Sequence, residues 1–415
     1  MQVEVDFCPE CGIPEPFSQG QTWLNNGDVV QGVNPEARLG FVECEILDPL
    51  FANIGEIIGV SIEGMVVNIT SRGTEKYMSN LIPASIKDMV QAKQMDPRIF
   101  LDNIMTYCHV IGFGRYEFVG TRYERDEDDY SITRVEAPFS VPEAAGGIAG
   151  VASALVGGEH AVSYREVSPG LFEYTTRWTE YPEVLVEKLQ TLPYRHREGD
   201  MEMERCATCG LPKALRDYDW HLDRGLIVNG RTGRRMAVLG PELLDTLFEA
   251  LEAELDETIP KAVVEAQRRL ARAGFFSVDE VKEEEYFRGQ LALRGMGNLR
   301  EMDMSPRGMH LRIDNSAGSL LTVGKVQGLF EATCGVDSSV DWELSGEGNL
   351  EVEVKPRGVV AAVSYLTGPL KLKEDDDFEI FHEIFCDIND RLGAACDVLE
   401  AARRDVKFMK EEAAR

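Results

Sequence analysis

Four cysteines in this chain form two pairs with the spacing of metal ligands. Cys8 and Cys11 lie in CPECGIP, and Cys206 and Cys209 lie in CATCGLP. Two thiolates three residues apart in a tight turn can face one metal ion, and the glycine that follows relieves the turn and lets backbone N–H groups point at sulfur. A tetrahedral site needs four such ligands. We therefore predict that the two pairs, although far apart in the sequence, meet at one metal ion.

Zinc is the metal we expect. A zinc ion with four thiolate ligands has no open coordination position, so the site would be structural and not catalytic. Iron, as a rubredoxin-like centre or a cluster, uses the same ligands and stays an alternative. Two separate sites, a redox-active pair or unliganded thiols also remain open. A thioredoxin-type pair opens a helix after a strand, which Gly12, Ile13 and Pro14 disfavour. Haem attachment is excluded, because glycine and not histidine follows each pair.

The cysteine pairs belong to a longer repeat. A tryptophan follows each pair, Trp23 in the first copy and Trp220 in the second. Later positions pair in the same order: Gly150 with Gly328, Gly157 with Gly335, and Tyr164 with Trp342. We interpret the chain as a duplicated domain with units 1–196 and 197–357, followed by a linker and a helix over 358–415. Pseudo-two-fold symmetry would place equivalent loops near one axis, and so would bring the four cysteines together.

Each unit has the same expected plan, which is α+β. A short hairpin follows the cysteine pair, helices come next, and a glycine-containing helix over 144–156 or 322–334 precedes the last strands. Pro260 divides the helical pattern of the second unit, because it lacks an N–H and blocks the preceding turn. The closing segments, such as HAVSYREV and LEVEVKP, alternate with the two-residue period of a half-buried strand. We expect helices packed on an antiparallel sheet in each unit.

The closing segment of each unit resembles the 4-vinyl reductase domain, also called the hydrocarbon-binding domain. The shared pattern covers about 110–178 and 293–356. It consists of a glycine-rich helix, a glycine break, a strand with a glutamate (Glu166 or Glu343), a tight polar turn and a final strand. The resemblance implies a small and often apolar ligand. Some members of that family are sensory domains of regulators that respond to aromatic compounds.

Members of that family often carry zinc-binding cysteines just after this glutamate and just before the last strand. Here Val167 and Leu344 follow the two glutamates. The last-strand positions hold Leu171, Phe172 and Leu350. The zinc site of the family therefore cannot be carried over to this segment, and the two CxxC pairs are a separate feature.

The net charge of −29 disfavours nucleic acid and anionic membrane surfaces as partners, because both would repel such a protein. The sequence has no apolar run of roughly 18 residues and no signal-peptide pattern at its beginning. The nine cysteines are an odd number, and with no export signal they indicate a reducing compartment. We expect a cytoplasmic protein.

No combination of residues predicts catalysis. The sequence has no G-x-S-x-G, no metal-hydrolase histidine pair and no recurrent acid–base dyad. The segment GGIAG at 146–150 lacks the lysine and serine of a phosphate loop, so we interpret it as a place of close helix packing. His109, beside Cys108, has no counterpart in the second unit, and we expect it on the face of a strand. We do not expect an enzyme, although the sequence leaves the question open.

The C-terminal region differs from both units. Apolar residues from Phe378 to Met409 recur at alternating intervals of three and four, which is typical of an amphipathic helix with a coiled-coil seam. Acidic residues at its beginning and basic residues near its end suit the helix dipole. The helix can dock on its own domains, or it can join two chains as a homodimer.

We therefore predict a tandem protein that binds a small apolar or aromatic molecule as a sensor, carrier or accessory factor. A four-cysteine zinc site would join its two units. Two other functions stay open. The first is an iron-binding redox or electron-transfer accessory protein. The second is a structural assembly protein that works through the C-terminal helix.

Overall fold

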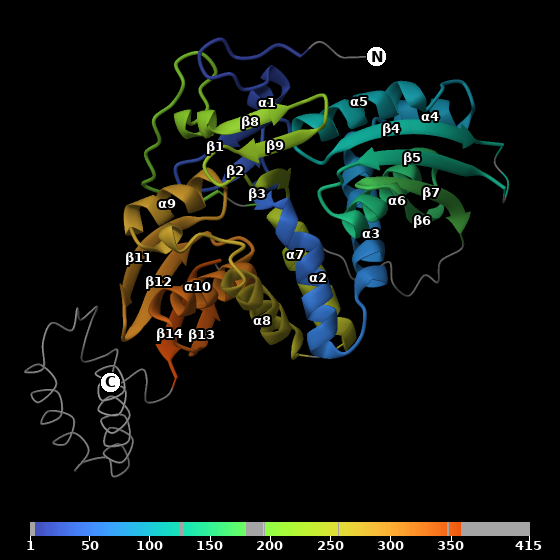
Figure 1. Cartoon of the computed structure of the whole chain (residues 1–415). Helices are drawn as coiled ribbons and strands as arrows, with labels where there is room; N and C mark the ends of the chain where they lie inside the picture. Colours follow the sequence, from blue (N-terminus) through green and yellow to red (C-terminus); the bar gives the residue numbers. More distant parts are fainter. Residues whose placement is uncertain are drawn as a thin grey trace, which may run out of the picture.

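The computed structural model describes residues 5–179, 194 and 196–357, apart from 125, 127, 256 and 347. Within these residues the chain forms three antiparallel sheets with helices packed around and between them, which confirms the predicted α+β class (Figure 1). The predicted C-terminal helix, in 358–415, lies outside the described residues. In the described ranges, no helix is long and apolar enough to cross a membrane.

The central sheet is built from both halves of the chain. Each half contributes the three short strands that follow its cysteine pair. They are β1 (Gln21–Trp23), β2 (Val29–Gln31) and β3 (Arg38–Glu43), and β8 (Tyr218–His221), β9 (Leu226–Asn229) and β10 (Arg235–Leu239). The order is β1-β2-β3-β10-β9-β8, and β3 pairs with β10 antiparallel, with Val42 opposite Ala237. This one pairing joins the two halves into a single sheet.

Each half also forms an outer four-stranded sheet. The strands are β4 (Arg115–Arg122), β5 (Tyr130–Glu136), β6 (Glu159–Ser168) and β7 (Leu171–Thr179), and β11 (Asn298–Ser305), β12 (Gly308–Asp314), β13 (Ser338–Leu344) and β14 (Leu350–Pro356). Their orders are β4-β5-β7-β6 and β11-β12-β14-β13, which is the same path counted along each half. A glycine-containing helix packs on each sheet, α6 (Val141–Val156) and α10 (Ser319–Cys334), as expected.

The remaining helices connect the central sheet to the outer sheets. In the first half they are α1 (Glu15–Gly20), α2 (Cys44–Ile58), α3 (Glu63–Leu81), α4 (Ala84–Gln91) and α5 (Arg98–Val110). In the second half they are α7 (Pro241–Leu255), α8 (Ile259–Arg272) and α9 (Glu284–Leu293), with short 3-10 turns η2 (Lys213–Asp217) and η3 (Val278–Val281). Pro260 lies in the first turn of α8, where its missing N–H costs nothing, as predicted.

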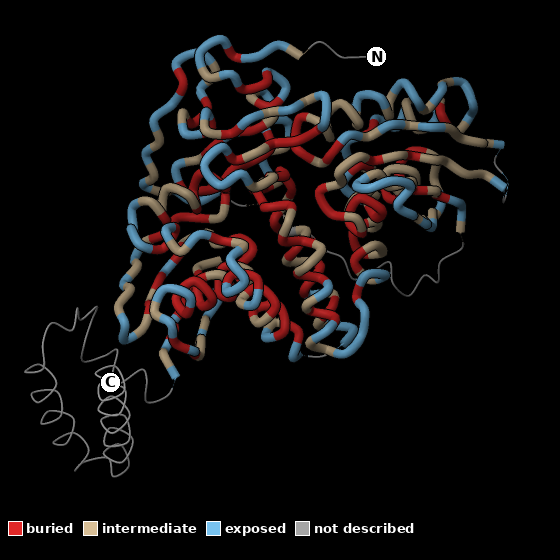
Figure 2. Tube along the Cα trace, viewed as in Figure 1, coloured by how far each residue is buried: buried red, intermediate tan, exposed pale blue. Residues whose placement is uncertain are grey.

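Helices α2 and α7 lie between the two outer sheets (Figure 1), and much of their surface is buried (Figure 2). Helix α2 packs on α8 and helix α3 packs on α7, so each contact crosses from one half of the chain to the other. The main apolar core is continuous across both halves. It contains residues of α2 and α7 such as Leu50 and Leu247, and residues under both outer sheets such as Tyr174 and Phe330.

The strands of each half lie against the outer part of the other half. The backbone N–H of Phe41 in β3 donates to the carbonyl of Arg294, after α9, at 2.9 Å. In the same way, the N–H of Val238 in β10 donates to the carbonyl of Ile111, after α5, at 2.9 Å. The indole Nε1 of Trp23 donates to the carbonyl of Leu293 at 2.9 Å. The two halves of the chain are therefore interlocked through their central strands.

Glycines let the helix pairs α3–α6 and α8–α10 approach closely. A Cβ at Gly146 would lie 2.5 Å from the carbonyl oxygen of Val67 in α3. A Cβ at Gly324 would lie 2.3 Å from the carbonyl oxygen of Val264 in α8. Neither distance is possible for a real side chain, so these positions need glycine. The interpretation of GGIAG as a place of close helix packing is confirmed.

Neighbouring glycines of α6 offer a matched test of this contact. We expect Gly146→Ala to lower the free energy of unfolding by about 1–3 kcal/mol, the usual cost of overpacking. At Gly147 a Cβ meets no atom within 4 Å, so Gly147→Ala should raise the stability by about 0.5–1 kcal/mol through helix propensity. Urea unfolding of both variants measures the difference. Equal effects would contradict the close α3–α6 contact.

Candidate functional site

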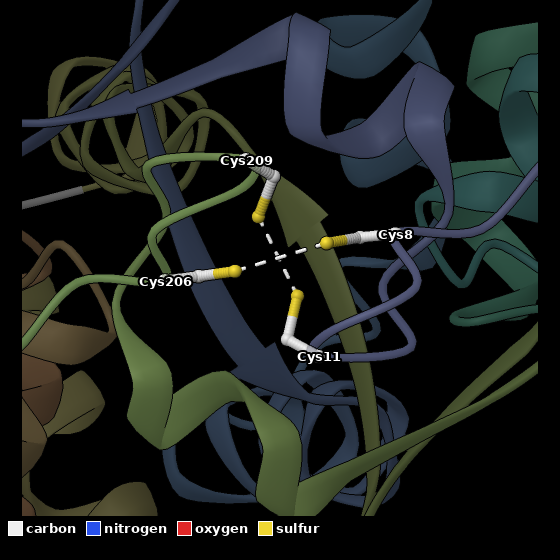
Figure 3. A group of neighbouring side chains, drawn as sticks. All are labelled: Cys8, Cys11, Cys206 and Cys209. Atoms are coloured by element: carbon white, nitrogen blue, oxygen red, sulfur yellow. Dashed lines mark hydrogen bonds between the residues drawn. The ribbon is translucent and has the colours of Figure 1, made fainter.

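The four predicted cysteines meet at one point. All four Sγ atoms lie within 4.8 Å of one another, and two loops aim them at a common centre (Figure 3). Cys8 Sγ lies 3.7 Å from Cys206 Sγ, and Cys11 Sγ lies 3.4 Å from Cys209 Sγ. A tetrahedral site with metal–sulfur bonds of about 2.3 Å has sulfurs about 3.8 Å apart. The observed distances are close to that value and much longer than a disulfide bond of about 2.05 Å. The cluster can therefore hold a metal ion.

The two cysteine loops have the same backbone hydrogen bonds. The N–H of Cys8 donates to Ile13 O at 2.8 Å, and the N–H of Gly12 donates to Cys8 O at 2.8 Å. The second loop repeats both bonds: the N–H of Cys206 donates to Leu211 O at 2.8 Å, and that of Gly210 donates to Cys206 O at 3.0 Å. Gly12 and Gly210 have φ values of 72° and 77°, a region that favours glycine. Each loop is therefore a closed turn that holds two sulfurs on one side.

Backbone N–H groups also stabilise the charged form of the sulfurs. Burial opposes ionisation of Cys8, but the N–H groups of Cys11 and Glu10 donate to its sulfur, and the pKa of the Cys8 thiol falls to about 7. Burial raises the pKa of Cys11 and of Cys209, although a backbone N–H donates to each of these sulfurs as well. A divalent ion at the centre would favour the thiolate form of all four, so metal binding would release protons.

Contacts outside the sulfurs also hold the loops together. The carboxylate of Glu10 accepts hydrogen bonds from the backbone N–H and the hydroxyl of Thr208, at 3.1 and 2.9 Å. Arg205 donates to the carbonyl of Trp23 at 2.9 Å. An apolar cluster that includes Phe17 and Tyr218 packs beneath both loops on the central sheet. These contacts and the shared apolar cluster hold the two loops side by side.

A second candidate site is a cavity of about 600 Å³ in the first half of the chain. It lies among α3, α5, α6 and the sheet of β4, β5 and β7. Val238 of β10 and Leu243 of α7, from the second half, complete its wall. Most of the lining is aliphatic or aromatic, including Ile69, Leu101, Ile104, Met105, Phe113, Tyr116, Phe118, Phe139, Ile148, Val151 and Leu155. The shape and chemistry suit an apolar molecule.

Glu143 lies in the wall of this cavity, in the first turn of α6. The residue is 1 % exposed, both of its carboxyl oxygens are buried, and Ser140 is the hydroxyl nearest to interact with them. Burial, with a further contribution from the negative charge of Asp48 in α2, raises the pKa of Glu143 to about 8. Tyr116 of β4 and Cys44 of α2 also lie near it. At neutral pH the group is therefore mostly a neutral carboxylic acid.

In the second half, charged side chains beside the corresponding helix are paired with one another. Lys325, on the helix α10 that corresponds to α6, pairs with Glu280 at 2.5 Å and lies over the ring of Phe276 at 4.5 Å. Glu331 of the same helix accepts from Arg268 at 2.9 Å and from the N–H of Ser338 at 2.7 Å.

The other residues considered from the sequence do not join a site. The expectation that His109 lies on a strand is wrong. The residue is in the last turn of α5, because this helix runs to Val110 before the chain turns. Its Nε2 accepts the backbone N–H of Tyr116 at 3.0 Å. Glu166 accepts the backbone N–H of Gly170 at 2.8 Å in an exposed turn. Sequence reasoning missed Glu143, whose only signal was an acid on the otherwise apolar helix VPEAAGGIAGV.

No protein-family model matches this chain, and no curated protein matches its sequence. The resemblance to the 4-vinyl reductase domain therefore stays a prediction that depends on the residues quoted for it. The fold and the site by themselves define an α+β protein with two features: a four-cysteine cluster able to hold a metal ion, and a mainly apolar cavity in the first half of the chain.

Removal of one cysteine pair tests whether the metal site is shared. We expect the purified protein to contain one metal ion per chain, and the double variant Cys206→Ser, Cys209→Ser to contain almost none. Its Tm should fall by about 10 °C or more, because the binding energy of a structural metal is also folding energy. Element analysis and thermal unfolding measure both effects. Cys334→Ser, away from the cluster, is the control. Full metal content in the double variant would mean that Cys8 and Cys11 bind alone.

The buried acid predicts a dependence of stability on pH. Glu143 holds its proton in the folded protein up to about pH 8, against an ordinary pKa of 4.5. The folded state therefore binds this proton more tightly than the unfolded state. The contribution of Glu143 to the free energy of unfolding is fully present below pH 4.5 and is lost as the pH rises towards 8. Glu143→Gln has no charge to bury, so its Tm should exceed that of the wild type more at pH 8 than at pH 5. Exposed Glu117, changed to Gln, is the control. Parallel melting curves across this range would contradict the raised pKa.

Proposed function

We propose that this protein binds a small apolar or aromatic molecule and acts as a sensor, carrier or accessory factor. The observation that carries the proposal is the cavity of about 600 Å³ between α3, α5, α6 and the outer sheet. Ligand pockets usually have volumes of roughly 300–1,000 Å³ and mostly apolar walls with a few polar groups. The resemblance of the same segment to the hydrocarbon-binding domain supports this function independently of the cavity.

The cavity supports binding better than catalysis. Cys108 lines its wall and His109 follows in the sequence, which are the residue types of a nucleophile and a base. Burial raises the pKa of the Cys108 thiol to about 12, so it is not a thiolate at neutral pH. The Nε2 of His109 already accepts the N–H of Tyr116. A nucleophile must lie within reach of a free base, so we propose a non-catalytic role.

The proposal for the metal centre is a structural zinc ion that joins two duplicated units, 1–196 and 197–357, related by a pseudo-two-fold axis. Three observations support it. The outer sheets share one strand order, the two cysteine loops share their backbone hydrogen bonds, and the sulfur spacing is close to that of a tetrahedral zinc site. A reducing compartment such as the cytoplasm would keep the thiolates available. We also propose that residues 358–415, which lie outside the described residues, join two chains as a homodimer.

An iron-binding redox or electron-transfer role is the alternative, since four thiolates also hold iron. The element analysis that counts the metal also identifies it. Zinc bound to thiolates is colourless, because its filled d shell has no visible transitions. A red or brown preparation with iron at the four cysteines would overturn the zinc proposal and leave the cavity proposal standing.

Filling the cavity tests the binding function. Gly147 faces the cavity from α6, and a Cβ there meets no atom within 4 Å. We expect Gly147→Phe to fold normally and to weaken binding of the fluorescent apolar probe N-phenyl-1-naphthylamine by at least about tenfold, because the new ring occupies the space of the ligand. A fluorescence titration measures the affinity.

Gly64→Phe is the matched control. Gly64 lies on α3, is exposed, does not line the cavity, and also has no atom within 4 Å of a Cβ. This variant should bind the probe as the wild type does. If Gly147→Phe binds equally well, the probe occupies another place and the cavity is not the binding site. When Gly147→Phe does weaken binding, mass spectrometry of small molecules that co-purify with the wild type, and not with this variant, identifies the natural ligand.

A further inference from the structure

The strand β4 forms part of the cavity wall with one of its two faces. Its side chains alternate, so that Arg115 and Glu117 are exposed to solvent while Tyr116 and Phe118 lie on the face towards α5. Both of these aromatic residues line the cavity. Tyr116 therefore brings a hydroxyl group into a wall that is otherwise mostly apolar.

The hydroxyl of Tyr116 has no hydrogen-bond partner among the described residues. Its oxygen keeps accessible surface, unlike the two carboxyl oxygens of Glu143, which have almost none. Because Tyr116 lines the cavity, this surface opens into the cavity and a bound molecule can reach it. Burial raises the pKa of Tyr116 well above its ordinary value of 10.0, so the group stays neutral and keeps its proton.

Two other tyrosines of the cavity lining are already engaged within the protein. The hydroxyl of Tyr77 donates to Gln31 at 2.9 Å, and the hydroxyl of Tyr107 accepts from Gln21 at 3.1 Å. A phenol hydroxyl has one O–H to donate. That of Tyr116 is available to a molecule in the cavity.

The second half of the chain has a leucine at the place of Tyr116. Gly114 and Gly297 are equivalent, because their φ values are 104° and 111° and the backbone N–H of each donates to a glycine carbonyl of the other half. Tyr116 and Leu299 each follow two residues later, in the same register with the next strand. Leu299 is 1 % exposed. Leucine therefore fits this place, and the sheet does not need a hydroxyl group there.

The same difference recurs on the neighbouring strands. Thr133 of β5 and Thr176 of β7 line the cavity, and the equivalent positions in the second half hold the buried Leu311 and Val354. The wall of the cavity thus carries neutral hydroxyl groups where the second half carries apolar side chains. This pattern suits a ligand with a neutral oxygen atom better than a pure hydrocarbon.

We propose that the hydroxyl of Tyr116 donates a hydrogen bond to a carbonyl oxygen of the ligand, and that the ligand is a neutral, mainly aromatic molecule with a carbonyl group, such as an aromatic ketone. This inference rests on the proposed binding function of the cavity. A carbonyl oxygen accepts hydrogen bonds and has none to donate, so one bond satisfies the Tyr116 O–H and leaves no polar group of the ligand unpaired. The apolar side chains of α5 and α6 would contact the rest of the molecule.

Other head groups fit less well. The titratable groups that act on the Tyr116 hydroxyl are Cys108, Tyr174 and Glu143, and each is neutral or negative. An anionic head group would therefore be buried without a cation, which is costly. An ammonium group has only donors, so it would leave the O–H unpaired, and the carboxyl oxygens of Glu143 are closed to it. A hydrocarbon would leave the O–H unpaired as well.

Two probes of similar size test the hydrogen bond: 2-acetonaphthone, which has a carbonyl group, and 2-isopropylnaphthalene, which has none. Each is titrated against the full chain carrying N-phenyl-1-naphthylamine, and its affinity is read from displacement of that probe. Tyr116→Phe removes only the hydroxyl group. We expect this variant to bind 2-acetonaphthone about tenfold more weakly than the wild type, the value of a net hydrogen bond. It should bind 2-isopropylnaphthalene at least as tightly.

Tyr77→Phe is the matched control, because Tyr77 also lines the cavity but its hydroxyl is paired with Gln31. This variant should change the affinities for the two probes by the same factor. Infrared spectroscopy gives a second measurement, since a hydrogen bond lowers the stretching frequency of a carbonyl group. Bound 2-acetonaphthone should absorb at a lower frequency in the wild type and in Tyr77→Phe than in Tyr116→Phe.

Two outcomes would overturn the inference. Equal loss of affinity for both probes in Tyr116→Phe would mean that the hydroxyl only supports the shape of the wall. Unchanged affinity for 2-acetonaphthone, with an unchanged carbonyl frequency, would mean that another group binds the carbonyl. Failure of the proposed function looks different, because then the wild type would bind neither probe at the cavity and Gly147→Phe would change nothing.

Discussion

The antiparallel pairing of β3 with β10 is the interaction on which the rest of the structure depends. It joins the short strands of the two halves into one six-stranded sheet, with Val42 opposite Ala237 at its centre. The helices that follow these two strands, α2 and α7, then run between the two outer sheets and pack on helices of the other half. Without this pairing each group of three short strands would have an open edge, which is unstable in water.

The metal centre lies on the same central sheet. Both cysteine loops come before the strands of this sheet, and both pack on one apolar cluster that its strands share. Each loop is already a closed turn with two sulfurs on one side, and neither half alone offers more than two ligands. A metal bound to all four sulfurs would strengthen the β3–β10 junction, because it links two loops that only a few side-chain contacts hold otherwise.

The two halves use one plan for different interiors. In the second half, Lys325, Glu280 and Phe276 fill the space beside α10, and the buried charges are paired. In the first half, Gly147 lines the cavity, and no atom lies within 4 Å of the place where its Cβ would be. Because β10 and α7 complete the wall of the cavity, the second half of the chain also shapes the interior of the first.

The sequence by itself determined the features that depend on local geometry. Three such features were predicted correctly. They are the tight turns that hold Cys8 with Cys11 and Cys206 with Cys209, the helix start at Pro260, and the close packing at Gly146. They follow from turn chemistry, a missing N–H and a missing Cβ. Only the tertiary structure decided what depends on contacts between distant residues. Three features belong to this second group: the pairing of β3 with β10 across the two halves, the place of His109 at a helix end, and the cavity with Glu143 in its lining. The sequence alone does not show whether an acid within an apolar helix has a partner or lies beside a cavity. The side chains that surround it come from distant parts of the chain, so only the tertiary structure shows its environment.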